Sequence, residues 1–310
     1  MLSLNVVGAG KLGRTLAALW HQNGVFEIAG LFSRSAANTH EAQDFIGAGT
    51  AVSDLDELPH AQVWLLAVPD DQIESTAAAL APIIARHQSL VSKPLMLFHC
   101  SGALPASVLA ASGVDLLASA HPVHSFADPK RSLADLPGST VALEGREEVI
   151  NVLEPAFTAL RCNCIHLSPS QKVLYHTGSV MACNYLTVLM DLSLQVFQAA
   201  GIDNKSAMTL LEPIVVQTVK NNFALGPARA LTGPLVRGDV ATVARQIEAL
   251  HQLAESSSTT NNDSDSTSGI QAATLAEMYR ALGKAALPLA EKAGLSQDAR
   301  RQLQSIFDEP

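Results

Sequence analysis

The sequence predicts an α/β protein in which a doubly wound parallel sheet is followed by an all-helical second domain. Three observations support this prediction. A glycine-rich turn near the N-terminus joins a strand-like run to a helix-like one, short aliphatic runs then alternate with helix-like segments, and no convincing strand follows Ser168. At 310 residues the chain is long enough for two ordinary domains. We therefore expect one domain over 1–168 and a helical one over 169–310.

The first strand is expected to lead through a glycine turn into a helix. The aliphatic run at 2–7 suits a buried parallel strand, and residues 15–20 are helix-like. A dinucleotide site needs three glycines between such elements, for a tight turn, for close approach of the pyrophosphate and for close packing of helix on strand. The helix N-terminus also offers free N–H groups and the positive end of its dipole. The residues expected to bind the dinucleotide here are Gly8, Ala9, Gly10, Lys11, Leu12 and Gly13; the alternative is a glycine turn without a ligand.

The second strand, expected over 26–32, ends where such a domain reads the adenosine ribose. A carboxylate about 20 residues beyond the glycines would bind the ribose diol of NAD. None stands there, and Ser33, Arg34 and Ser35 offer two hydroxyls and a guanidinium, which suit a 2′-phosphate. This favours NADP over NAD. The alternative is that Arg34 is an arginine of a solvated loop.

Further strands and helices follow in alternation. The expected strands cover 62–68, 95–100, 115–120, 138–143 and 163–167. Between the first two, residues 73–84 show helical spacing, and Asp70 and Asp71 in front of them suit capping. This alternation is what predicts a parallel sheet.

The second domain is expected to contain helices only, at 170–200, 204–224, 239–255 and 270–293. Gly201 suits the end of the first of them. The segment 255–269 lacks apolar residues and cannot offset its own ordering entropy, so it is expected to be a disordered loop. A phosphorylation target or an acidic docking loop is the alternative.

The bulk properties favour a cytoplasmic protein that binds small molecules. The formal net charge of −9 gives no basic surface for a nucleic-acid backbone and disfavours an anionic membrane. The four cysteines form no C-x-x-C pair and follow no secretory leader, which predicts reduced cytoplasmic thiols. Asn184 and Asp191 interrupt the apolar helix near 176–200, so no membrane-spanning helix is expected.

Ligands of an open α/β sheet bind beyond the carboxyl ends of its strands, and three predicted loops lie there. The first loop contains Ala67, Val68 and Pro69, which we expect beside the nicotinamide half of the cofactor. An ordinary strand-to-helix turn is the alternative.

The other two loops carry histidines. His99 and Ser101 lie in the second loop, and His121 and His124 lie in the third. His121 is the first candidate for catalysis, because histidine titrates near neutrality and can exchange the proton that accompanies hydride transfer. Ser101 is a further catalytic candidate, and His99 is expected to contact the cofactor. Packing roles are the alternative, and no metal site is predicted, because the histidines have no further ligand at a suitable spacing.

The first helix of the second domain adds Lys172, His176 and Asn184 as catalytic candidates. Positions i, i+4 and i+12 fall on one stripe of an α-helix, so these side chains are expected to point together into a cleft. Lys172 is suited to polarise a carbonyl or imine, or to supply its proton. The alternatives are a solvated lysine and two helix-packing residues.

These features together resemble a family of Rossmann-like proteins whose C-terminal helical part is known as a domain of unknown function. The resemblance covers nearly the whole chain. The motifs that carry it are Gly8-Ala9-Gly10-Lys11-Leu12-Gly13, Ala67-Val68-Pro69-Asp70-Asp71, His99-Cys100-Ser101-Gly102, His121-Pro122-Val123-His124-Ser125-Phe126, Lys172 with Tyr175-His176, Asn184-Tyr185, and Leu231-Thr232-Gly233-Pro234 with Arg237-Gly238-Asp239.

The wider superfamily is similar in architecture and includes ketopantoate reductase, pyrroline-5-carboxylate reductase and the β-hydroxyacid dehydrogenases. The resemblance implies a helical domain like the C-terminal domain of 6-phosphogluconate dehydrogenase, which contributes to a homodimer and closes the active-site cleft. In the β-hydroxyacid dehydrogenases an asparagine follows the catalytic lysine by four residues, and here His176 occupies that position after Lys172.

The function expected is an NADP-dependent oxidoreductase that reduces a small keto or imino acid by hydride transfer. An anionic substrate needs local positive charge, for which Lys172 and Arg237 are the candidates. The alternative is a non-catalytic NADP-binding sensor or scaffold, because a fold does not by itself imply a function.

Overall fold

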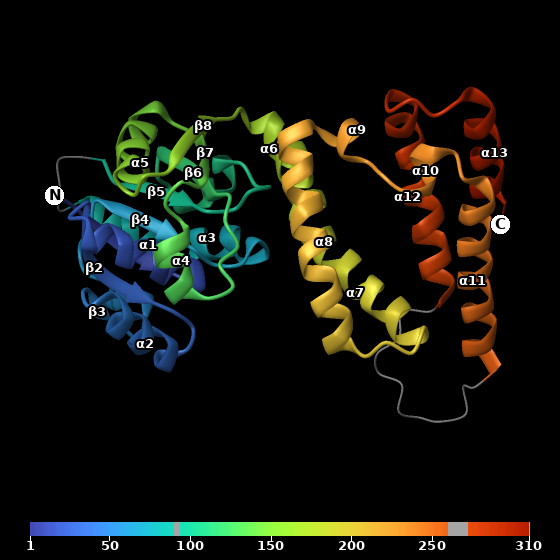
Figure 1. Ribbon diagram of the computed structural model, residues 1–310. Coiled ribbons are helices and arrows are strands. Elements are labelled where there is room, and N and C mark those ends of the chain that lie inside the picture. The colour runs from blue at the N-terminus through green and yellow to red at the C-terminus, as the bar shows by residue number, and fades with distance from the viewer. Residues whose placement is uncertain (90–93, 260–271, 310) are drawn as a thin grey trace. The chain divides into compact units, whose positions relative to one another are not determined.

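The computed structural model describes residues 1–89, 94–259 and 272–309 (Figure 1). They fall into two compact units, Met1–Asn184 and Tyr185–Pro310. The first unit contains the sheet and the second is helical, which confirms the predicted fold class.

The sheet has eight strands in the order β3-β2-β1-β4-β5-β6-β7-β8. The strands are β1 (Leu2–Val7), β2 (Phe26–Phe32), β3 (Thr50–Ala51), β4 (Val63–Leu66), β5 (Met96–His99), β6 (Leu116–Pro122), β7 (Thr140–Gly145) and β8 (Asn163–His166). The order reverses between β1 and β4, and the crevice at the carboxyl ends of such a pair is where ligands of this kind of sheet bind.

One pair departs from the expected parallel arrangement, because β6 and β7 are antiparallel. The connection between them contains only the short helix α4 (Pro129–Asp135). The N–H of Val123, just after β6, donates to the carbonyl of Thr140 at the start of β7. The connection therefore returns the chain to the end of the sheet where β6 finishes, so β7 must run in the opposite direction.

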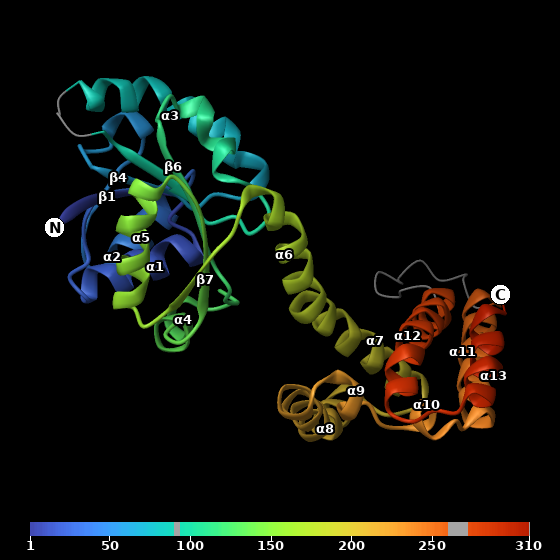
Figure 2. The same ribbon diagram turned by 90° about the horizontal axis from the view of Figure 1, so that it is seen from above.

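Helices cover both faces of the sheet (Figure 2). The helices α1 (Lys11–Gln22), α2 (Ala36–Ile46) and α5 (Glu147–Ala159) contribute to one core, and α3 (Ile73–Gln88) contributes to the other. In the first core Trp20 is fully buried, with its ring centroid 5.2 Å from both Phe26 and Phe157. Edge-on aromatic contacts of this kind fix α1 against β2 and against α5.

The helix expected over 170–200 is divided in three. It consists of α6 (Lys172–Ser179), a π-helical segment (Val180–Asn184) and α7 (Tyr185–Ala199). The two compact units meet inside this run, whereas residue 168 was the expected boundary. Hydrogen bonds that Lys172 and Tyr175 make to the strand side explain why α6 belongs to the first unit.

The second unit continues with α8 (Asn204–Leu225), α9 (Pro227–Ala230), α10 (Pro234–Arg237), α11 (Val240–Thr259), α12 (Ala272–Lys292) and α13 (Gln297–Asp308). Its core joins α11, α12 and α13 through Val243, Leu287, Leu303 and Phe307. The helix α13 was not expected. The first residues of the loop expected over 255–269 are helical, because α11 continues to Thr259, and the rest of that segment lies outside the described residues.

The run Pro169–Ala199 is long and apolar enough to cross a membrane, with a mean hydropathy of 1.4 in its most apolar part. The expectation that Asn184 and Asp191 exclude this was wrong, since the surrounding aliphatic residues outweigh them. One such helix is weak evidence for a membrane span, because core helices of soluble proteins have the same composition.

Candidate functional site

The three glycines of the first turn each occupy a position that serves a different purpose. Gly8 has a φ of +96°, and a Cβ there would lie 2.6 Å from the carbonyl carbon of Ala67. A Cβ on Gly13 would lie 2.4 Å from the carbonyl oxygen of Gly8, which is how closely α1 packs on the turn. Around Gly10 nothing lies within 4 Å of a Cβ position, so this side of the turn is open. These are the requirements of a dinucleotide turn.

The start of α1 presents free main-chain donors. Gly10 is the N-cap and no side chain caps it, so first-turn N–H groups, including those of Lys11 and Leu12, lack an acceptor within the helix. The turn itself is held by β2. The N–H of Gly8 donates to the Phe32 carbonyl at 2.8 Å, and the N–H of Ala9 donates to the Ser33 hydroxyl at 3.1 Å. A pyrophosphate would meet these donors without rearrangement of the turn.

A cleft of about 740 Å³ opens beside this turn. The predicted cofactor-binding residues in its lining are Gly8, Gly10, Ser33, Arg34, Ser35, Ala67, Val68 and Pro69. Arg34 is the one cationic residue of the lining, and it is exposed. The Ser35 hydroxyl accepts from the Asn38 N–H at the start of α2, and the Ser33 hydroxyl accepts from Ala9, so the two serines shape the wall. The open glycine side, the free helix donors and the cation fit a dinucleotide phosphate.

The cleft is connected to a second group of polar residues through Asp70, which directly follows Pro69. The Asp70 carboxylate accepts a 2.7 Å hydrogen bond from the Ser101 hydroxyl, in the loop after β5. That hydroxyl also accepts from the N–H groups of Ala103 and Leu104. With its donor and acceptors all engaged, Ser101 orders the loop.

The His99 side chain holds the same loop through hydrogen bonds to its main chain. It is fully buried, its Nδ1 accepts from the Ser101 N–H at 3.0 Å, and its Nε2 lies 3.2 Å from the Pro105 carbonyl. Nε2 must therefore carry the proton, and the ring is neutral. Burial lowers the pKa of His99 to about 4. Both ring nitrogens of His99 are thus engaged within the protein, so neither is free to make the predicted contact with the cofactor.

Lys172 is fully buried. It is therefore neither a solvated lysine, as the alternative interpretation had it, nor a side chain that extends toward a substrate. Its Nζ donates to the Ser101 carbonyl at 3.1 Å and to the Ser119 hydroxyl at 2.5 Å. Burial lowers the pKa of its ammonium, and the carboxylates of Glu144 and Asp70 oppose that shift.

Three partly exposed aromatic side chains lie at the carboxyl end of β6. His121 Nδ1 is 2.9 Å from the Tyr175 hydroxyl, and the His121 and His176 rings are 5.5 Å apart, edge to face. Gly102 fits between the two histidines, because a Cβ there would lie 2.4 Å from His176 Nδ1. Burial lowers the pKa of His121 to about 4 and raises the pKa of Tyr175 to about 12. At neutral pH both groups are therefore uncharged and can exchange a proton with a ligand.

Asn184 is not brought to this group. It is exposed and ends the π-helical segment, and no contact between it and Lys172 or His176 is found in the described part of the chain. The expectation assumed an α-helical period through residue 184. A π turn contains an extra residue, which rotates the following positions off the stripe.

Several residues of the group were not expected from the sequence, namely Asp70 as a partner, Gly102, Ser119, Glu144 and Tyr175 as a site residue. One signal was available, because Ser119 and His121 are two apart on β6 and so face the same side of the sheet. Glu144 pairs with Ser119 across β6 and β7, a register that no sequence pattern indicated.

Two family models match the chain. A Rossmann-like domain matches residues 1–118, and the domain of unknown function DUF2520 matches residues 139–286. These matches confirm the resemblance inferred from the motifs. No curated protein matches the sequence.

Solved structures share the fold over nearly the whole chain. A candidate NADP oxidoreductase from Bacteroides fragilis is 17% identical, with a TM-score of 0.69, and the match covers 93% of this chain and 98% of that one. Protein TM1727 from Thermotoga maritima is 22% identical, with a TM-score of 0.60 and the same coverage. A pyrroline-5-carboxylate reductase from Coxiella burnetii is 14% identical, with a TM-score of 0.53 over 98% of each chain. At such identities the likeness shows the fold alone.

Proposed function

We propose that this chain, a Rossmann-like domain joined to a DUF2520 domain, is an NADP-dependent oxidoreductase that reduces a small keto or imino acid. One observation carries the proposal. The loop that lines the nucleotide cleft continues directly into Asp70, and Asp70 is hydrogen-bonded to Ser101 at the base of the His121–Tyr175–His176 cluster. A nucleotide cleft and a proton-exchanging cluster are thus joined, as hydride transfer coupled to proton transfer requires.

The choice of NADP rests on Arg34. When bound, the nicotinamide would supply the hydride to the carbonyl or imine carbon. A guanidinium in the cleft wall favours the dianionic 2′-phosphate, and the lining contains no carboxylate to bind a ribose diol.

Besides the hydride, the reaction needs a proton and a fixed position for the groups that transfer it. The hydrogen-bonded pair of His121 and Tyr175 supplies the proton to the substrate oxygen or nitrogen, and in the reverse direction the neutral imidazole accepts it. Ser101 and Lys172 hold the loop behind the pair.

Nucleotide titration followed by a turnover assay tests the proposal. We expect saturable NADPH binding, and oxidation of NADPH in the presence of one or more 2-keto acids or cyclic imines. Binding without turnover across a broad panel would instead support the non-catalytic sensor. The absence of NADPH binding would contradict both functions.

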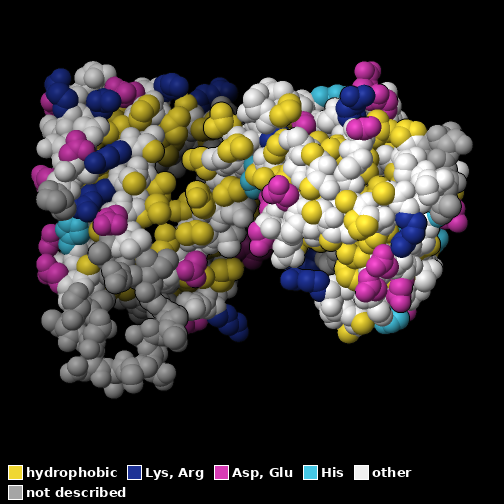
Figure 3. All heavy atoms as spheres, turned by 180° about the vertical axis from the view of Figure 1, so that it is seen from behind, with side chains coloured by type: hydrophobic (Ala, Val, Ile, Leu, Met, Phe, Trp, Pro, Cys, Tyr) yellow, Lys and Arg dark blue, Asp and Glu magenta, His cyan; other side chains and the backbone are white. Residues whose placement is uncertain are grey.

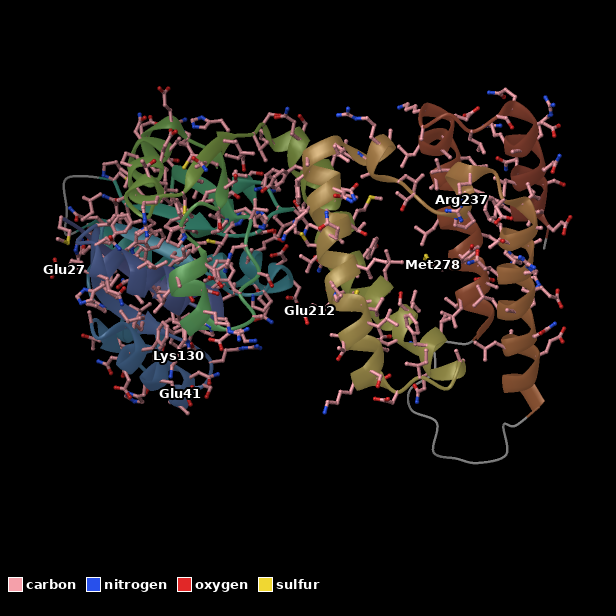
Figure 4. The ribbon with its side chains drawn as sticks, in the orientation of Figure 1. Glu27, Glu41, Lys130, Glu212, Arg237 and Met278 are labelled. Atoms are coloured by element: carbon pink, nitrogen blue, oxygen red, sulfur yellow. The ribbon has the colours of Figure 1, made fainter. Side chains whose placement is uncertain are left out.

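For the partner we propose a second copy of the chain, bound through the helical unit. Figure 3 shows hydrophobic side chains on the surface of that unit. On α8 the exposed apolar side chains of Met208, Val216, Val219 and Phe223 fall on one face of the helix. An apolar groove of about 310 Å³ is lined by α7, α11 and α12 and includes Met278 (Figure 4). Patches of this kind mark protein interfaces.

Light scattering should give twice the chain mass of 32.6 kDa. Phe223→Asp should give monomers, and Asn221→Asp, on the opposite face of α8, should not.

We propose that the protein works in the reducing cytoplasm, in keeping with a sequence whose four cysteines form no C-x-x-C pair.

A further inference from the structure

A buried lysine connects the cluster to the sheet. Lys172 begins α6, and its ammonium is fixed by the Ser101 carbonyl and the Ser119 hydroxyl. Tyr175 and His176 follow it by three and four residues, so they lie on the same face of α6, one turn further on. Both of them contact His121. The anchor at Lys172 therefore determines where these two side chains meet His121.

The ammonium has carboxylates close to it. Glu144 is buried and accepts a 2.7 Å hydrogen bond from the Ala106 N–H, and it is the cross-strand partner of Ser119. Asp70 lies on the other side of Ser101. Two acceptors and two nearby carboxylates suit a charged lysine at a position that water does not reach.

Lys172 is not placed to touch a substrate. Its side chain is fully buried, and two of its three donors are used inside the protein. An effect of Lys172 on the reaction must therefore act through other groups.

We infer that Lys172 is a positioning residue: its ammonium, fixed by the Ser101 carbonyl and the Ser119 hydroxyl, holds the start of α6 so that Tyr175 and His176 lie against His121, and its positive charge disfavours a second positive charge on the His121 imidazole. The relevance of this inference to catalysis rests on the proposed function. The effect of Lys172 on the pKa of His121 can be measured without it. It assigns the buried ammonium a role in positioning and tuning one imidazole rather than in contact with a ligand.

The groups that face His121 act in both directions. Burial is the largest cause that lowers its pKa, and His176 and Lys172 on α6 lower it further. Asp70, after β4, raises it, and Tyr175 forms the hydrogen bond. Removing the lysine charge takes away repulsion of the imidazolium, so the pKa of His121 should rise.

The test is an NMR pH titration of the histidine rings in the full chain, with His121 assigned from the spectrum of His121→Gln. In the native protein we expect the titration midpoint of His121 to lie well below pH 6, near its lowered pKa of about 4. In Lys172→Met we expect its midpoint to rise by about one pH unit, because the like charge of the buried ammonium is lost. Lys172→Arg, which keeps the charge, should leave the midpoint close to the native value. Lys130→Met, at an exposed lysine of the same unit (Figure 4), is the matched control and should change nothing.

Loss of Lys172 leaves Glu144 buried without its cation, which could prevent folding. The double variant Lys172→Met with Glu144→Gln removes both charges and keeps an acceptor for Ala106, and it is compared with Glu144→Gln alone. If turnover is found, the acid limb of the kcat profile should move to higher pH with the His121 midpoint, while the KM for NADPH stays the same.

The results separate the two proposals. An ordinary midpoint near pH 6.5 for His121 in the native protein, or an unchanged midpoint in a folded Lys172 variant, would overturn the inference whatever the activity. Absence of NADPH turnover would overturn only the proposed function, because the titration needs no substrate.

Discussion

The Ser101 hydroxyl donates a 2.7 Å hydrogen bond to the Asp70 carboxylate. This bond joins two loops that follow neighbouring strands, β4 and β5, and it links the wall of the nucleotide cleft to the loop beneath His121 and His176. A ligand that moves the loop after β4 would therefore act on the loop after β5 without touching it.

Gly10→Val should abolish nucleotide binding without unfolding the protein. Nothing lies within 4 Å of a Cβ at Gly10, so the apo protein accommodates a side chain, but the side chain fills the place of the pyrophosphate. Fluorescence titration with NADPH and thermal unfolding measure the two effects. Gly178→Ala is the matched control, because its Cβ position is also free; it should bind normally and gain about 0.5–1 kcal/mol in helix stability. Native affinity in a folded Gly10→Val variant would show that the nucleotide binds elsewhere.

Arg34→Ala should remove the preference for NADPH. A charged hydrogen bond from guanidinium to phosphate contributes about 1.5–3 kcal/mol, so the native protein should bind NADPH at least about tenfold more tightly than NADH. The variant should bind both nucleotides with the affinity of the native protein for NADH. Arg131→Ala, at an exposed arginine of α4, should keep the preference. Equal affinities in the native protein would contradict the role given to Arg34.

Gly102→Ala should reduce turnover strongly while leaving NADPH affinity nearly unchanged. The new methyl group would lie 2.4 Å from His176 Nδ1 and 2.9 Å from His121 Cε1, so both rings must move. The nucleotide cleft does not include Gly102. Steady-state kinetics and NADPH titration on the same preparation distinguish the two effects. A variant with native kcat would place the chemistry away from these histidines.

Stability should fall as the pH drops from about 6.5 towards 4. The pKa of His99 is lowered to about 4 by burial, so between these values the unfolded chain binds a proton that the folded protein excludes. The stability is thus fully present above pH 6.5 and is lost as the pH falls, by about 3 kcal/mol for a fully buried group. Urea unfolding at a series of pH values measures the loss. His99→Asn should reduce this dependence to the part that His121, whose pKa is also lowered to about 4, contributes. His21→Asn, at an exposed histidine of α1, should preserve the native dependence. Equal slopes in all three proteins would contradict a neutral His99.

The parts of the structure that could be predicted from sequence are those that depend on local pattern. The turn at Gly8–Gly13 and the aliphatic strands have short-range signatures, and they predicted the Rossmann-type sheet correctly. The burial of Lys172 could not be predicted, since its acceptors at Ser101 and Ser119 are 71 and 53 residues away in the chain. The separation of Asn184 from His176 depends on a π turn, which leaves no pattern in the residues themselves.

The order already present in the glycine turn has a thermodynamic consequence. Its main-chain groups are fixed by the Phe32 carbonyl and the Ser33 hydroxyl before any ligand arrives. Little conformational entropy is then lost at the turn when a nucleotide binds, so more of the interaction energy is expressed as affinity. A phosphate site that is ordered in advance favours binding of the cofactor before the substrate. Selectivity among substrates would then depend on the cluster of His121, Tyr175 and His176.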